Sequence, residues 1–188
     1  MKNKIIEKSV ELFEKNGFTE TSIQHIVDAL HVTKGTFYYY YQSKEQLLCD
    51  IHIQYIDDLL ERQERVISEG QTAKEKLYNI IKLLIEDIED KGQSALVFFR
   101  EIRHLLKENE EIIKEKRDMF RLNIENIIRM GVENGEFQDN IQPNIVAFAL
   151  LGMTNYSYNW YNPMGPVTPQ ELVEQYYNIF MNGLLKGK

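Results

Sequence analysis

Apolar residues recur at helical spacing along almost the whole chain of 188 residues. No segment has the alternating apolar and polar residues that are typical of a half-buried strand. All four prolines lie at residue 143 or later, so none interrupts the first 142 residues. The pattern therefore predicts an all-α fold. The expected helices cover about 2–16, 22–30, 33–40, 44–69, 73–90, 93–106, 109–134, 143–161 and 169–186.

Several of these helices begin at recognisable caps. The segments Thr21–Gln24, Ser43–Gln46 and Thr168–Glu171 each place Ser or Thr three residues before Gln or Glu, which is the pattern of a capping box. Thr33 is the expected cap of a short third helix, and Gly17 is the expected end of the first. Two short helices joined by a tight turn, the second of them polar and aromatic, indicate a helix-turn-helix that binds DNA.

The second of these short helices has residue types suited to the major groove of DNA. Gly35 lets the backbone approach a phosphate closely, and Thr36 is short enough to reach base edges. The hydroxyls of Tyr38 and Tyr39 can donate to phosphate oxygens. The alternative is that the four consecutive tyrosines only hold a small three-helix unit together, and this role is compatible with DNA binding.

The segment Ala29–Leu47 resembles the signature of the TetR family of repressors, and Gly17–Ile23 is similar to the turn that precedes it there. This resemblance, over about residues 3–50, implies a helix-turn-helix DNA-binding domain at 1–45 and a helical ligand-binding and dimerisation domain at 46–188. It implies that Val32, Phe37, Tyr40 and Tyr41 form the small core. The residues expected to contact DNA are Thr21, Thr33, Lys34, Gly35, Thr36, Tyr38, Tyr39 and Lys44, with Lys44 on a phosphate.

Two residues depart from the family's pattern. His31 replaces the usual glycine of the turn, so we expect a positive φ at a residue type that tolerates one. Tyr41 replaces the usual phenylalanine, so its hydroxyl needs a partner if the ring is buried.

Charge and composition narrow the possible functions. Residues 1–45 are neutral, and the whole net charge of −7 lies in 46–188. Cys49 is the single cysteine, which excludes an internal disulfide and a zinc finger. No apolar stretch is long enough to span a membrane and no secretory signal is recognisable, so a cytoplasmic protein without a membrane partner is expected.

An enzyme is the less favoured class. Glu101 and His104 have the Glu-x-x-His spacing of di-iron sites, but those sites need a second copy and two more glutamates. No phosphate-binding or dinucleotide-binding motif occurs. We therefore expect no catalytic residue, cofactor or metal; a helical enzyme or a protein-binding adaptor remains an alternative.

The C-terminal part indicates a dimer. The expected helix 143–161 is apolar on nearly every side, so it must be buried, and a second subunit can supply part of that burial. Ala147, Ala149 and Gly152 would allow close helix approach. The alternative is an internal core helix without a partner. These predictions describe a homodimer on double-stranded operator DNA.

The C-terminal part from Asn140 onward also resembles a TetR subgroup that controls fatty-acid or sterol-ring breakdown and responds to acyl-CoA thioesters. This resemblance implies a repressor released by an apolar effector such as an acyl-CoA. The rival is a hydrophobic cation, as sensed by multidrug-type repressors. Arg100 and Arg103 could meet the effector's phosphate or carboxylate, or could instead pair with surface acids such as Glu101 and Glu108. The candidate effector-binding residues, each of which could equally be ordinary core, are Leu96, Phe99, Arg100, Arg103, Phe120, Ile124, Ile127, Met153, Tyr156 and Trp160.

Overall fold

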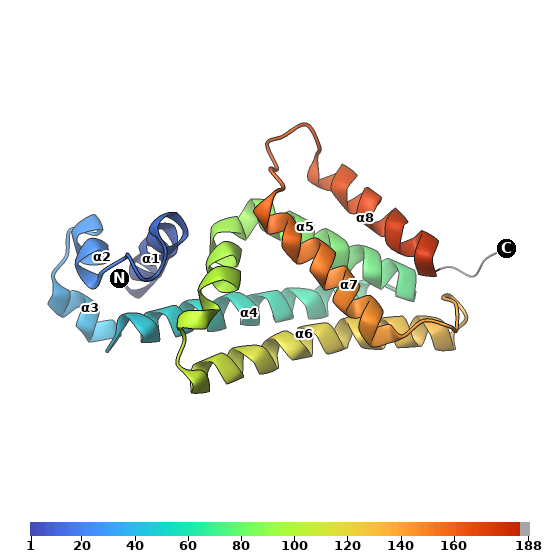
Figure 1. Cartoon of the computed structure of the whole chain (residues 1–188), viewed down its shortest axis with the longest axis horizontal. Coiled ribbons are helices and arrows are strands. Elements are labelled where there is room, and N and C mark those ends of the chain that lie inside the picture. The colour runs from blue at the N-terminus through green and yellow to red at the C-terminus, as the bar shows by residue number, and fades with distance from the viewer. Residues whose placement is uncertain (185–188) are drawn as a thin grey trace. The chain divides into compact units, whose positions relative to one another are not determined.

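The computed structural model describes residues 1–184, which form α-helices, short 3-10 helices and the loops between them (Figure 1). The expected all-α fold is confirmed. The end of the expected helix 169–186 lies outside the described residues. In chain order the helices are α1 (Lys2–Asn16), α2 (Ile23–Ala29), α3 (Lys34–Tyr40), α4 (Lys44–Glu69), α5 (Ala73–Glu101), η1 (Ile102–His104), α6 (Lys107–Glu133), α7 (Pro143–Tyr156), η2 (Ser157–Asn159) and α8 (Pro169–Leu184).

The chain folds into two compact units, each made of two segments. The first unit combines 1–57 with 91–115, and the second combines 58–90 with the residues from 116 onward. The long helices α4, α5 and α6 each contribute to both units. The functional division expected at residue 45 stays a prediction, because packing groups the segment 91–115 with the N-terminal helices.

The middle of the chain follows the expected pattern, except at the end of its second helix. Two separate helices were expected over 73–90 and 93–106, and the break between them is confirmed, although the second helix ends at Glu101. The element α5 consists of two helical segments that meet at a kink, where the torsions of Lys91 leave the helical region (φ −134°, ψ 22°). Gly92 directly follows the kink, and the second segment continues to Glu101 before a turn of 3-10 helix.

The helix caps lie where the sequence predicts them, except that the cap of α2 is one residue later than expected. Gly17 ends α1 at φ 83°, as expected. The cap of α2 is Ser22 instead of Thr21: the Ser22 hydroxyl accepts from the His25 amide (3.1 Å), and the Ser22 amide donates to His25 Nδ1 (3.3 Å). The Thr21 side chain is instead buried, and its hydroxyl donates to the Gly17 carbonyl at the end of α1 (2.8 Å).

Two further caps match the expected pattern in full or in part. At the start of α8, Thr168 and Glu171 form the complete expected box, in which each side chain accepts from the other residue's amide. At the start of α4, the Ser43 hydroxyl accepts from the Gln46 amide (3.0 Å), while the Gln46 side chain accepts from Gln42.

Both departures from the family's pattern have the expected consequence. His31 adopts φ 54°, the left-handed conformation that glycine usually supplies. The Tyr41 ring is buried and its hydroxyl donates to Asp50 Oδ2 (2.6 Å), which satisfies it. Burial and the neighbouring Asp50 raise the pKa of Tyr41. Phe37 is fully buried beside Tyr41, as expected, whereas Val32 and Tyr40 are only half-buried.

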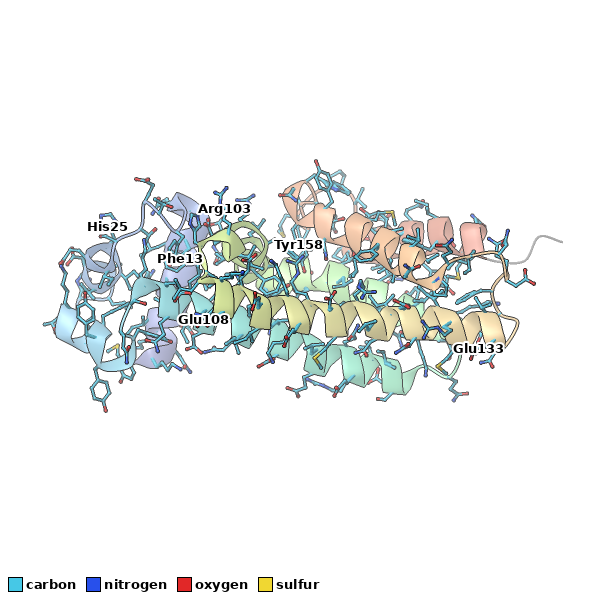
Figure 2. All side chains as sticks on the ribbon, turned by 60° about the horizontal axis from the view of Figure 1, so that its bottom comes forward. Phe13, His25, Arg103, Glu108, Glu133 and Tyr158 are labelled. Atoms are coloured by element: carbon cyan, nitrogen blue, oxygen red, sulfur yellow. The ribbon has the colours of Figure 1, made fainter. Side chains whose placement is uncertain are left out.

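A buried charged cluster joins three elements of the second unit. The Asp87 carboxylate on α5 is fully buried; it accepts from Arg62 Nη2 on α4 (2.5 Å) and from the Tyr158 hydroxyl on η2 (2.9 Å). Arg62 Nε also donates to Asp58 (2.7 Å). Burial alone would lower the pKa of Arg62, but Asp87 and Asp58 raise it above its ordinary value. Tyr158 is labelled in Figure 2.

Candidate DNA-binding and effector sites

The short helix α3 packs on the core through one buried side chain and has an N-terminal cap. Phe37 points into the core and is fully buried. The Thr33 hydroxyl accepts from the Thr36 amide (3.3 Å) and lies 3.2 Å from the Thr36 hydroxyl. This cap fixes the residue at which α3 begins. The face of α3 opposite Phe37 therefore has a defined orientation.

That outer surface has the polar and aromatic character expected of a DNA-reading helix. Tyr39 is 81% exposed and Tyr38 is 54% exposed, and the Tyr39 ring meets Tyr40 edge-on at 4.9 Å. Thr36 is half-buried. Six of the eight residues expected to contact DNA lie on α3 and its cap; they are Thr33, Lys34, Gly35, Thr36, Tyr38 and Tyr39.

The other two expected contacts, Thr21 and Lys44, have side chains directed into the protein. Thr21 is fully buried, so its side chain is not available to DNA in this conformation. Lys44 Nζ donates to the carbonyls of Phe18 (2.5 Å) and Thr21 (2.6 Å). The sequence reasoning missed this because both carbonyls lie more than 20 residues before Lys44 in the chain.

Four of the expected effector-binding residues belong to the first unit. Leu96 and Phe99 are half-buried, while Arg100 and Arg103 are exposed. Within residues 1–184, neither guanidinium forms an ion pair, so the expected alternative of pairing with Glu101 or Glu108 is not found there. Glu101 instead lies 3.3 Å from His104 Nε2.

The other six expected effector-binding residues belong to the second unit. Phe120, Ile124 and Ile127 are buried on α6, and Met153 is half-buried on α7. Tyr156 and Trp160 are more than half exposed. For all ten residues, contact with an effector stays a prediction.

Helix α7 has an exposed apolar face in the single chain. Ile145 is 57% exposed and Phe148 56% exposed; Ala149 and Gly152 lie on the same exposed side. A Cβ atom built at Gly152 would meet nothing within 4 Å. Ala147, also expected to allow close helix approach, is instead fully buried in its own chain. The helix is therefore not buried on every side within one chain.

The structure also bears on metal and membrane binding. Among residues 1–184, no three His, Cys, Asp or Glu side chains are grouped so that they could hold a metal ion. Within the same range, no helix combines the length and apolar character needed to cross a membrane.

Comparison with known families identifies the class of protein. The family model for bacterial regulatory proteins of the tetR family matches residues 5–51, and the model for the tetracyclin repressor-like C-terminal domain matches residues 70–184. The chain belongs to the TetR family, and it is a ligand-responsive, DNA-binding transcriptional regulator. Repressors of this family bind DNA as dimers.

Individual relatives extend over almost the whole chain. The transcriptional repressor KstR2 of Rhodococcus jostii is 25% identical over 185 residues, covering 97% of this chain and 90% of that protein. The structure of KstR2 from Mycobacterium tuberculosis superimposes with a TM-score of 0.90 at 22% identity, covering 99% of this chain and 95% of that one. The structure of AibR in complex with isovaleryl coenzyme A and operator DNA has a TM-score of 0.87 at 23% identity, covering 95% and 96%.

Proposed function

We propose that this protein is a cytoplasmic, non-enzymatic repressor that binds an inverted-repeat operator as a homodimer and leaves it when an acyl-CoA binds. The observation that carries the DNA-binding part is the outer surface of α3, which is formed by Thr33 to Thr36 and two exposed tyrosines while Phe37 is buried in the core. One reading helix per chain requires two half-sites, about one helical turn of DNA or a multiple of it apart.

Different residues of α3 have different roles in this proposal. Thr36 reads a base edge or a thymine methyl, because its side chain is short and lies where the helix enters the groove. Lys34, Tyr38 and Tyr39 contact phosphates, which sets the position of the helix without reading sequence.

The Thr36→Ala variant is expected to lose about 1–3 kcal/mol of operator affinity through one base pair of each half-site. Its preference at that base pair should relax, while other positions keep theirs. Affinities for a set of operators substituted one base pair at a time measure this. Lys34→Met is the matched control, because loss of a phosphate contact weakens all the operators alike. Uniform weakening by Thr36→Ala would contradict the assigned role.

The acyl-CoA effector is supported by three observations. The solved relative AibR carries isovaleryl coenzyme A together with operator DNA. The C-terminal half supplies apolar and aromatic side chains that suit an acyl chain. Arg100 and Arg103 are exposed cations that form no ion pair among residues 1–184, so they are available to an anionic coenzyme.

The rival effector, a hydrophobic cation, has less support. Such a ligand requires a buried carboxylate beside aromatic rings. Buried Asp87 already lies against Arg62, and Glu101 lies against His104. The negative net charge of the C-terminal part favours a cation only weakly, because exposed charges are screened beyond about 8 Å at physiological salt.

A panel of acyl-CoA thioesters, starting with isovaleryl-CoA, is expected to lower operator affinity and raise the melting temperature. An effector shifts the population only if it binds the form unable to hold DNA more tightly. At about 100 times its Kd it should stabilise that form by about 2.7 kcal/mol. Fluorescence anisotropy with labelled operator and thermal scans provide the two readouts, with free coenzyme A as reference.

Variants separate the coenzyme contact from general effects on the protein. Arg100→Gln combined with Arg103→Gln should keep operator affinity and lose the response to acyl-CoA. Arg129→Gln is the matched control, because Arg129 is also half-exposed but pairs with Glu125 on its own helix (2.6 Å). If no acyl-CoA changes operator affinity or melting temperature while lipophilic cations release the DNA, the cation alternative replaces this proposal.

A further inference from the structure

Lys44, the first residue of α4, has all three of its donors directed at backbone carbonyls. Its ammonium lies 2.5 Å from the Phe18 carbonyl, 2.6 Å from the Thr21 carbonyl and 3.5 Å from the Thr19 carbonyl. It also lies 4.2 Å from the centre of the Phe18 ring, within the range of a cation–π contact. An ammonium group has three N–H donors, so this arrangement uses its full capacity.

These carbonyls converge because of how the chain turns between α1 and α2. Gly17 ends α1 at φ 83°, and the Thr21 hydroxyl donates back to the Gly17 carbonyl (2.8 Å). The loop 17–21 is thereby folded on itself, with its carbonyl groups on the side of Lys44. The next residue is Ser22, the N-cap of α2, so fixing the Thr21 carbonyl also fixes where α2 begins.

The surroundings hold the Lys44 side chain in this place. Phe18 packs edge-on against Phe13 (5.2 Å) and is stacked on His104 (5.2 Å), so the ring under the ammonium is itself fixed. Burial lowers the pKa of Lys44, while the carboxylates of Glu20 and Glu101 oppose that change. A partly desolvated ammonium that left for a phosphate would give up its hydrogen bonds to the Phe18 and Thr21 carbonyls, both of them part-buried, and the longer one to Thr19.

We propose that Lys44 is a positioning residue for DNA reading: it fixes the loop 17–21, and through it α2 and α3, without contacting phosphate. This inference rests on the proposed DNA-binding function and differs from the phosphate contact expected from the sequence. Helix α2 lies between the loop and α3, and it packs on both α1 and α3. A displaced loop therefore displaces the helix that reads DNA.

The test is Lys44→Met, which keeps the apolar stem and removes the donors and the charge. Affinities for operator and for a scrambled duplex are measured over a range of salt, well below the melting temperature. Positioning predicts that the ratio of specific to non-specific affinity falls by about tenfold or more, while the slope of log K against log salt is unchanged. Lys34→Met is the control with a lost phosphate contact, and its slope should fall by about 0.9 per half-site.

Two outcomes would overturn the inference. If Lys44→Met lowers the salt slope by about 0.9 per half-site and keeps the specificity ratio, Lys44 contacts phosphate. If slope and ratio are both unchanged and only the melting temperature falls, its role is structural alone.

Hydrogen exchange gives a readout that does not depend on DNA. In Lys44→Met the amides of His25 and Ile26, which bond to Ser22, should exchange at least about tenfold faster, with those of α1 unchanged. Unchanged exchange at these amides would contradict the inference even if an operator had not been found. Failure of the wild type to bind any DNA would instead count against the proposed function.

Discussion

Gly152→Arg is expected to yield a folded monomer whose operator affinity is about 100-fold or more below that of the wild type. The glycine lies on the exposed face of α7 beside Ala149, and a Cβ atom built there meets nothing within 4 Å in one chain. The fold therefore accommodates the arginine. A second subunit packed on this face would meet a long charged side chain at its centre. Loss of the second reading helix removes an effective-concentration gain of about 10²–10⁴.

The measurement combines light scattering at micromolar concentration with operator affinity. Gly92→Arg is the matched control, because it adds the same charge at a helical glycine that also has open space around it. The control should remain a dimer with nearly wild-type affinity. A Gly152→Arg protein that is still dimeric and binds the operator normally would show that the α7 face is not the dimer interface.

Arg62→Met is expected to lower the free energy of unfolding by about 3 kcal/mol, because it removes the guanidinium from the buried Asp87 carboxylate. The Asp87 side chain is fully buried and the Arg62 side chain is 19% exposed, so water can compensate only in part. For a chain of this size the melting temperature should fall by about 6–12 °C. Urea denaturation measures the change directly.

Two further variants show whether burial causes this loss. Arg65→Met removes an exposed partner of Glu61 in the next turn of α4, and it should cost less than about 1 kcal/mol. Arg62→Met combined with Asp87→Asn should recover part of the loss, because no buried charge then needs compensation. Equal effects of Arg62→Met and Arg65→Met would mean that the Asp87 cluster does not stabilise the second unit.

Local signals made most helix boundaries predictable. The bounds of α1 and α4 match their expected ranges because Gly17 and Ser43 act on the nearest turn of backbone. The positive φ of His31 was predicted from the resemblance, because glycine is usual at this position of the turn. The division expected between residues 90 and 93 corresponds to the kink of α5 at Lys91, which Gly92 follows.

Contacts between distant segments could not be predicted in the same way. The capping pattern of Thr21 was present, but Ser22 is the cap of α2, and the Thr21 hydroxyl donates to the Gly17 carbonyl at the end of α1. Lysine commonly contacts phosphate, yet the ammonium of Lys44 donates to backbone carbonyls of the loop around Phe18. Arg62 and Asp87 are 25 residues apart on different helices, and nothing in their spacing indicates that they meet.

The most direct test of the whole account is the stoichiometry of binding to DNA from the region upstream of the protein's own gene. Fluorescence anisotropy and footprinting should find one inverted repeat, protected by two chains, with half-sites about 34 Å or a multiple of it apart along the helix axis. Affinity should exceed that for scrambled DNA by about 10³-fold or more at physiological salt. Binding by single chains, or equal affinity for operator and scrambled duplex, would contradict the account.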